Sequence, residues 1–389
     1  MKSRTTPVFL AFLAMGFGDA VGPFMSLAKK EFLLSNSAAS LIPFVGLSMY
    51  GVLSIPTGIL QSRYGKKPVL MAGLLLTLVG VLNASFGLTS FERFLLTVVL
   101  LGSGATIIQV SGNPMMRDVS AEGETARNLV LGQFVKALGS LSGPLIPVVA
   151  ARYMGLSWRV IFPVYSVALI LIILAATTLR FRRDENNAQA ATLRSCLKLL
   201  ENGYARAMVI AIFLYVGAEV CVSAGIPLLL KERFGVDVAR VGLLGTGLFF
   251  ITLTAGRFCG GLILKWIAPS LFWKISCAVS LIGLLALFSN LKGVAVAGLL
   301  LTGLGFANIF PLVFSAALDR MPKQANELSG LMVTAIVGGA VLPLLMGLIA
   351  DHSSVVRGFV VPLACILYVS AVAMLTRYDA AISKAEYAS

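Results

Sequence analysis

The chain has 389 residues, of which 58% are hydrophobic and only 12% are charged, and its mean hydropathy is +0.92. A soluble globular domain carries about 25% charged residues, so the composition excludes a water-soluble fold and indicates a membrane protein. The net charge of +14 would suggest nucleic-acid binding in a soluble protein, but here we expect the basic residues in loops between membrane spans.

Apolar stretches of about twenty residues recur along the whole chain, and each can cross the ~30 Å hydrocarbon core as a helix. We predict an all-α integral membrane protein with twelve transmembrane helices. The predicted spans are 7–28, 37–60, 68–88, 93–116, 128–151, 158–180, 206–230, 238–264, 270–289, 294–317, 325–350 and 356–376.

The longest polar stretch lies between the sixth and seventh predicted spans and contains a short amphipathic helix. We expect residues 1–180 and 206–389 to form two six-helix bundles joined by a cytoplasmic linker at 181–205. The larger share of the 31 basic residues falls on one side of the predicted topology, which favours cytoplasmic termini. The five cysteines are scattered without a CxxC pair, so we expect neither a disulfide framework nor a metal site.

The two halves resemble each other at an offset of about 200 residues. Asp19 in the first span corresponds to Glu219 in the seventh, "GSGATIIQ" (102–109) to "GLGFANIF" (303–310), and "GSLSGPLIP" (139–147) to "GGAVLPLLMG" (338–347). Such a six-helix repeat is typical of transporters in which one half rocks against the other around a midplane site. The repeat therefore predicts two pseudo-symmetric bundles and transport by alternating access.

Two carboxylates stand within predicted spans, where an ionised acid is costly and is by default a functional candidate. We expect Asp19 to be the proton carrier, loading and releasing a proton as its access alternates. The alternative is a carboxylate that only holds the glycine-rich helix in shape. Glu219 could accept hydrogen bonds from a solute, titrate as a second proton site, or serve packing alone.

A lysine in the fifth span is the least expected residue of the chain. Lys136 follows Gln133 by three residues, so both share one helix face. Three interpretations are open: an internal pair with Asp19 that opens on protonation, a binding group for an anionic substrate, or a side chain that extends to the membrane interface.

Neutral polar residues complete the predicted binding site. Gln109 and Asn113 are four residues apart in the fourth span and lie on one face. Amide groups both donate and accept hydrogen bonds, which suits sugar hydroxyls, although hydrogen bonds between helices would explain them as well. Asn308 in the tenth span is a similar candidate, and Tyr50 could stack on a sugar ring.

The stretch "GILQSRYGKKP" (58–68) resembles the loop motif between the second and third helices of the major facilitator superfamily. The matching residues are Gly58, Leu60, Arg63, Gly65, Lys67 and Pro68. Ser62 replaces the acid of that motif and Lys66 an arginine, so its usual charge lock is altered. The resemblance implies a gating role for Arg63 and Lys67.

Further stretches resemble one branch, the fucose–galactose–glucose:proton symporters. They are "GDAVGP" (18–23), "QVSGNPMM" (109–116), "FLYVGAEVCVSAGIPLLL" (213–230), "AGRFCGGLILKWIAP" (255–269) and "GFANIFPLVFSAAL" (305–318). The resemblance implies the twelve-helix fold and proton-coupled sugar uptake with Asp19 as proton carrier. It also implies that Arg257 gates the inner mouth or contacts substrate, although an arginine near a helix end is often an interface anchor. Gln109 stands where this branch has an acid and Lys136 where it has an uncharged side chain.

We therefore predict a secondary transporter, a proton-coupled symporter of a monosaccharide or sugar derivative, in the inner membrane of the cell. The alternatives are a symporter of an anionic sugar acid or other organic acid recognised by Lys136, and a drug:proton antiporter. With one histidine the chain cannot form HExxH, and it has no GxSxG or phosphate-binding loop, so we do not expect an enzyme. We expect no cofactor or metal, a proton gradient as the energy source with sodium left open, and a monomer in the lipid bilayer without a nucleic-acid partner.

Overall fold

The computed structural model describes residues 2–19, 27–29, 31–87, 90–179, 191–236 and 246–376, and these ranges contain helices and no strand. The main helices of the first half are α1 (Lys2–Asp19), α3 (Asn36–Tyr64), α4 (Lys66–Ser85), α5 (Phe91–Val119), α6 (Thr125–Met154) and α7 (Ile161–Thr177). Those of the second half are α9 (Gly203–Phe234), α11 (Thr246–Ile263), α12 (Pro269–Ala286), α13 (Lys292–Phe306), α14 (Ile309–Arg320), α15 (Ala325–Thr334), α16 (Gly338–His352) and α18 (Val360–Leu375). The short helices α8 (Leu193–Lys198) and α17 (Val355–Gly358) lie in connections.

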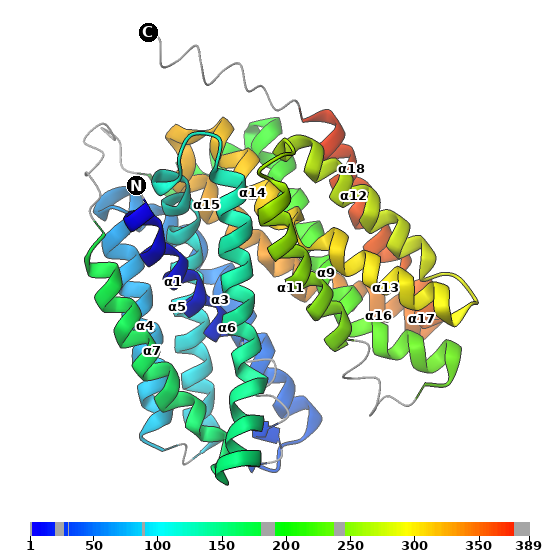
Figure 1. Cartoon of the computed structure of the whole chain (residues 1–389), viewed down its shortest axis with the longest axis horizontal. Helices are drawn as coiled ribbons and strands as arrows, with labels where there is room; N and C mark the ends of the chain where they lie inside the picture. The colour runs from blue at the N-terminus through cyan, green and yellow to red at the C-terminus, as the bar shows by residue number, and fades with distance from the viewer. Residues whose placement is uncertain are drawn as a thin grey trace.

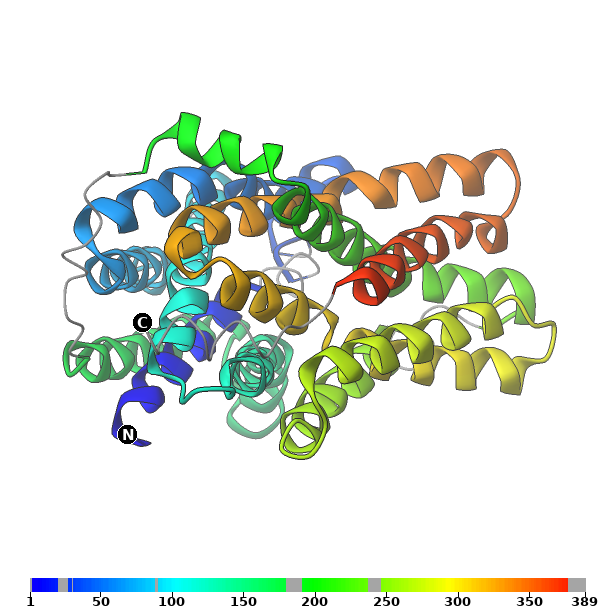
Figure 2. The ribbon, with the colours of Figure 1, turned by 90° about the horizontal axis from the view of Figure 1, so that it is seen from above.

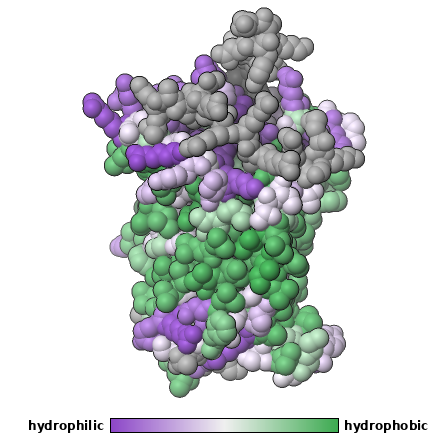
Figure 3. Space-filling view, turned by 90° about the vertical axis from the view of Figure 1, so that its left-hand side faces the viewer, coloured by the Kyte–Doolittle hydropathy of each residue, from purple (hydrophilic) through white to green (hydrophobic). Residues whose placement is uncertain are grey.

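The helices confirm the predicted twelve-span membrane fold. Ten helical segments of the described ranges are long and apolar enough to cross a membrane, and the shorter apolar helices 5–19 and 247–263 supply the other two spans. The remainder of the predicted spans 7–28 and 238–264 includes residues outside the described ranges. The face seen in Figure 3 has a hydrophobic band between two more hydrophilic ends, as expected for a bilayer-spanning protein.

Each half has a hydrophobic core of its own. One core is built from buried side chains of α1 to α7, and the other mainly from those of α9 to α18. The two groups of helices lie side by side in both ribbon views (Figures 1 and 2). The start of α1 and the end of α18 lie at the same side of the molecule, at the top of Figure 1, which we call the terminal side. We call the opposite side the far side.

Glycines allow α1 and α6 to pack closely. A Cβ atom added to Gly16 would lie 2.1 Å from the carbonyl oxygen of Lys136, and one added to Gly139 would lie 2.4 Å from the carbonyl oxygen of Leu13. Small residues at crossing points let membrane helices approach until their backbones touch. The close crossing holds the end of α1, where Asp19 lies, against the turn of α6 that carries Lys136.

We expect Gly139→Ala to separate α1 from α6 and to destabilise the protein by about 1–3 kcal/mol, the usual cost of overpacking. The measurement is thermal unfolding of the detergent-solubilised protein. Gly347→Ala on α16 is the matched control, because a Cβ atom there meets nothing within 4 Å and alanine favours a helix. Equal unfolding temperatures of Gly139→Ala and the parent protein would contradict the packing argument.

The two halves meet mainly at the terminal side, where α3 packs on α15 and α6 packs on α11 and α14 (Figure 1). Pro114 of α5 has no N–H group, so the carbonyl of Val110 lacks the donor it would have in a regular helix. That carbonyl instead accepts a hydrogen bond of 2.7 Å from the Ser329 hydroxyl of α15. A proline kink in one half thus supplies an acceptor for the other half.

Further polar contacts join the halves at this side. Arg117 at the end of α5 forms an ion pair of 3.2 Å with Asp319 at the end of α14. Arg127 at the start of α6 donates to the carbonyl of Gly261 on α11. From these contacts the ribbons of the halves diverge toward the far side (Figure 1). The structure is therefore held together at the terminal side.

Candidate functional site

A charged cluster lies between α1, α5 and α6 in the first half. The ammonium nitrogen of Lys136 is 3.0 Å from the Oδ2 atom of Asp19 and donates to Oε1 of Gln109 at 3.3 Å. The hydroxyl of Ser140, one turn beyond Lys136, donates to the same Asp19 oxygen at 3.3 Å. The structure thus brings together three of the predicted site residues and adds a fourth.

The surroundings of the pair bear on one of the three interpretations of Lys136, the extension to the membrane interface. Its side chain is only 13% exposed, whereas that of Asp19 is 36% exposed. Lys136 is directed at Asp19 and Gln109 inside the bundle, so it does not extend to the membrane interface. The lysine cancels the acid's charge and the acid remains partly accessible, which are the conditions for a carboxylate that exchanges a proton within a membrane.

Three other predicted residues of the first half are buried and have polar atoms without partners. They are Tyr50 of α3, Asn113 of α5 and Gln133 of α6. The Tyr50 hydroxyl, both amide atoms of Asn113 and the Gln133 amide nitrogen lack a hydrogen-bond partner among the described residues. Tyr50 lies near enough to Asp19 for an electrostatic interaction. Buried polar atoms are normally satisfied, so these residues have free capacity to bind a ligand or water.

A second charged cluster occupies the other half. Oε1 of Glu219, midway along α9, is 3.9 Å from an Nη2 atom of Arg257 on α11, and both side chains are largely buried. Tyr215, one turn before Glu219, is near both of them and donates to the carbonyl of Phe306 at 2.8 Å. Arg257 is therefore not an anchor at the membrane interface.

Asn308 lies at the break between α13 and α14. It is 2% exposed, and its amide nitrogen donates to the carbonyl of Gly256 on α11 at 3.0 Å. Its Oδ1 atom has no partner among the described residues. The Asn308 side chain thus forms a hydrogen bond between helices, which was one of the two interpretations. Its Oδ1 atom remains free to accept a hydrogen bond from a ligand.

The two predicted gating residues of the motif at 58–68 lie elsewhere. Lys67 donates to the carbonyls of Thr177 and Leu179 at the end of α7, within its own half, and Arg63 is exposed. Lys66, next in the motif, forms an ion pair of 2.5 Å with Asp118. A gating role for Arg63 and Lys67 stays a prediction. The two hydrogen bonds of Lys67 described here do not connect it to the other half.

Sequence reasoning missed several residues that matter for the geometry. Ser140 could have been found, because it lies four residues after Lys136 and hence on the same helix face. The Val110 acceptor could have been found from Pro114 four residues later. Arg117, Asp319 and Ser329 carry no such signal, because their contacts depend on how the two halves dock.

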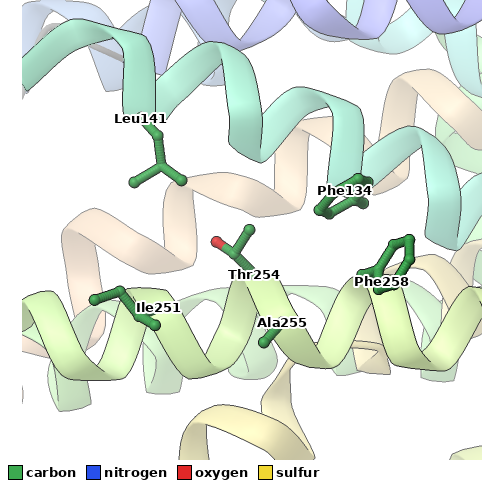
Figure 4. Close-up of a pocket in the computed structure, with 6 residues that line it drawn as sticks. All are labelled: Phe134, Leu141, Ile251, Thr254, Ala255 and Phe258. Atoms are coloured by element: carbon green, nitrogen blue, oxygen red, sulfur yellow. The ribbon is translucent and has the colours of Figure 1, made fainter. Parts of the chain in front are cut away.

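An apolar pocket of about 360 Å³ lies between α6 and α11, lined by Phe134, Leu141, Ile251, Thr254, Ala255 and Phe258 (Figure 4). Its single hydroxyl, that of Thr254, already donates to the carbonyl of Phe250 at 2.7 Å. The pocket shares no residue with the polar clusters. Its lining offers no free hydrogen-bonding side chain, so it does not suit a solute rich in hydroxyl groups.

Two helical bundles spanning a membrane, with paired charges in the helices of each half, define the class of membrane transporters with an internal repeat. The model of the Major Facilitator Superfamily matches residues 8–342. The chain belongs to this family of transporters and not to an enzyme family.

Relatives and solved structures agree with the assignment. The chain is 27% identical to a glucose/galactose transporter of Brucella abortus, covering 94% of this chain and 92% of the relative. It is 22% identical to an L-fucose-proton symporter of Haemophilus influenzae, covering 92% and 93%. The crystal structure of the major facilitator transporter FucP in the outward conformation matches with a TM-score of 0.81 at 18% identity, covering 94% of this chain and 97% of that one.

Proposed function

We propose that the protein is a symporter that carries a neutral monosaccharide together with a proton by alternating access. The observation that carries this proposal is the 3.0 Å pair of Lys136 and Asp19. The lysine's charge is already balanced by an acid of the chain, so an anionic solute is not needed to balance it. The relatives named as glucose/galactose transporter and L-fucose-proton symporter support a neutral sugar and a proton.

The proposed cycle starts with contacts between the halves at the terminal side. A proton from the far side neutralises Asp19, and Lys136 loses the ionic partner that held it. The unpartnered groups of Tyr50, Asn113 and Gln133 can then bind sugar hydroxyls. The halves rock, the contacts at the terminal side break, and Asp19 releases its proton there.

The terminal side is the cytoplasmic side in this proposal, because most basic residues of the predicted loops lie there. The protein would then take up sugar through the inner membrane of the cell, as a monomer with both termini inside. The proton gradient is the energy source, and no cofactor takes part. Replacing sodium in the medium by another cation tests whether sodium is coupled instead.

The test is solute uptake into proteoliposomes under an inward proton gradient. We expect glucose or galactose to accumulate above equilibrium, the accumulation to collapse with a protonophore, and replacement of sodium to have no effect. Accumulation of a sugar acid such as a uronate in place of the neutral sugars would assign Lys136 to anion binding. Extrusion of amphipathic drugs without sugar uptake would show a drug:proton antiporter.

A further inference from the structure

The charge pair of the second half differs in geometry from that of the first. The 3.9 Å between Glu219 Oε1 and Arg257 Nη2 is longer than a hydrogen bond, whereas Lys136 and Asp19 are 3.0 Å apart. Tyr215 interacts with both side chains, but its hydroxyl proton is donated to the carbonyl of Phe306. Glu219 and Arg257 balance each other's charge, and the carboxylate keeps acceptor capacity for a further donor. Their side chains are 19% and 12% exposed, so the pair is partly accessible.

A break in the tenth span fixes the arginine of this pair. Pro311 of α14 has no N–H group, so the carbonyl of Ala307 lacks its regular helical donor. Arg257 Nε donates to that carbonyl at 3.4 Å, which leaves the Nη atoms for other partners. The Ala307 carbonyl of the "ANIFP" stretch thus binds Nε of the guanidinium group, while Nη2 lies on the side of Glu219.

The same break places an unsatisfied acceptor beside the arginine. Asn308 follows Ala307 directly, and its buried Oδ1 atom has no partner among the described residues. Gly260 of α11, three residues after Arg257, gives this side chain room, since a Cβ atom on Gly260 would lie 2.4 Å from Oδ1. The break therefore places a free acceptor, Oδ1 of Asn308, next in sequence to the carbonyl that holds Arg257.

We propose that Glu219 and Arg257 act as one recognition unit for two adjacent hydroxyl groups of the sugar, and that Glu219 does not carry the coupled proton. The carboxylate accepts from one hydroxyl and the guanidinium donates to the oxygen of the next. A guanidinium so close compensates the acid's charge, so Glu219 need not be protonated to stay in the membrane. The inference rests on the proposed sugar transport and deepens it.

The test compares binding of the transported hexose with that of its deoxy analogues, each lacking one hydroxyl, by the purified full-length protein. For one pair of adjacent hydroxyl groups, we expect removal of either one or both, tested one at a time, to weaken binding to the parent protein. The loss should be about ten- to hundredfold relative to the hexose, because each analogue loses a hydrogen bond to a charged group. Glu219→Gln should bind the hexose at least tenfold more weakly and should no longer discriminate against that analogue. At saturating hexose it should still accumulate sugar under a proton gradient.

Arg257→Lys provides a second variant, because it keeps the charge and loses the fork of donors; it should lose the same discrimination. Glu232→Gln, near the end of the same helix and bonded to the backbone of Val355, is the matched control and should bind like the parent. Unchanged discrimination in Glu219→Gln would overturn the inference, and so would lost accumulation with intact affinity. If the parent protein carries no neutral sugar, the proposed function itself fails, which is a different result.

Discussion

Replacing Asp19 by asparagine is expected to abolish concentrative sugar uptake while sugar exchange continues. The asparagine keeps the size of the side chain and can still accept from Lys136 and Ser140, but it cannot load a proton. The measurement is hexose accumulation in proteoliposomes under an inward proton gradient, with exchange of labelled hexose in the absence of a gradient as the second assay. We expect accumulation to fall to the equilibrium level and exchange to keep at least about a tenth of its rate, because binding is retained.

Asp351→Asn is the matched control, because Asp351 is an exposed acid near the end of α16 on the far side. This variant should accumulate sugar like the parent protein. Full accumulation by Asp19→Asn would remove the proposed proton carrier. Loss of both accumulation and exchange, with unchanged folding, would indicate that Asp19 is required for binding instead.

Replacing Lys136 by glutamine is expected to lower proton-driven uptake at least tenfold. Removing one partner of a buried ion pair costs about 3–5 kcal/mol. We expect the lower end or less here, because Asp19 is 36% exposed. Without the lysine, an ionised Asp19 has no counter-charge in the membrane, so the acid favours its neutral form and releases its proton poorly. Uptake rate and thermal stability of the variant are the measurements.

The double variant Asp19→Asn/Lys136→Gln distinguishes the interaction between the two side chains from the separate effect of each one. If the two side chains act as a pair, the double variant should be more stable than Lys136→Gln alone and should exchange sugar without accumulating it. Lys274→Gln on α12 is the control for removal of a lysine from a membrane helix. Normal coupled uptake by Lys136→Gln would contradict both the ion-pair and the anion-binding interpretations.

The sequence predicts the fold well because the membrane constrains it strongly. Apolar length alone locates the spans, and the repeat at an offset of about 200 residues predicts two bundles. The crossing of α1 and α6 could be suspected from "GSLSG", but its closeness could not, since Gly16 and Gly139 are 123 positions apart. The pairing of Asp19 with Lys136 was one of several open interpretations, because helix periodicity gives a residue's face but not its neighbour on another helix.

Contacts between the halves could not be predicted from the sequence. The partners of Arg117 and Val110 depend on how far one bundle is rotated against the other, and that rotation changes during alternating access. The partner of Arg257 illustrates the same limit within one half. The resemblance implied that Arg257 gates the inner mouth or contacts substrate, and its place near a helix end suggested an interface anchor. The structure holds it between the carbonyl of Ala307 and the carboxylate of Glu219.

The most direct test of the proton-carrier role of Asp19 is a pH recording of the medium around lightly buffered, de-energised proteoliposomes when glucose or galactose is added. We expect the medium to become more alkaline with the parent protein, because each sugar takes a proton inward. Asp19→Asn should give no pH change while still exchanging sugar. An equal alkaline shift with Asp19→Asn, or sugar entry through the parent protein without any shift, would contradict that role.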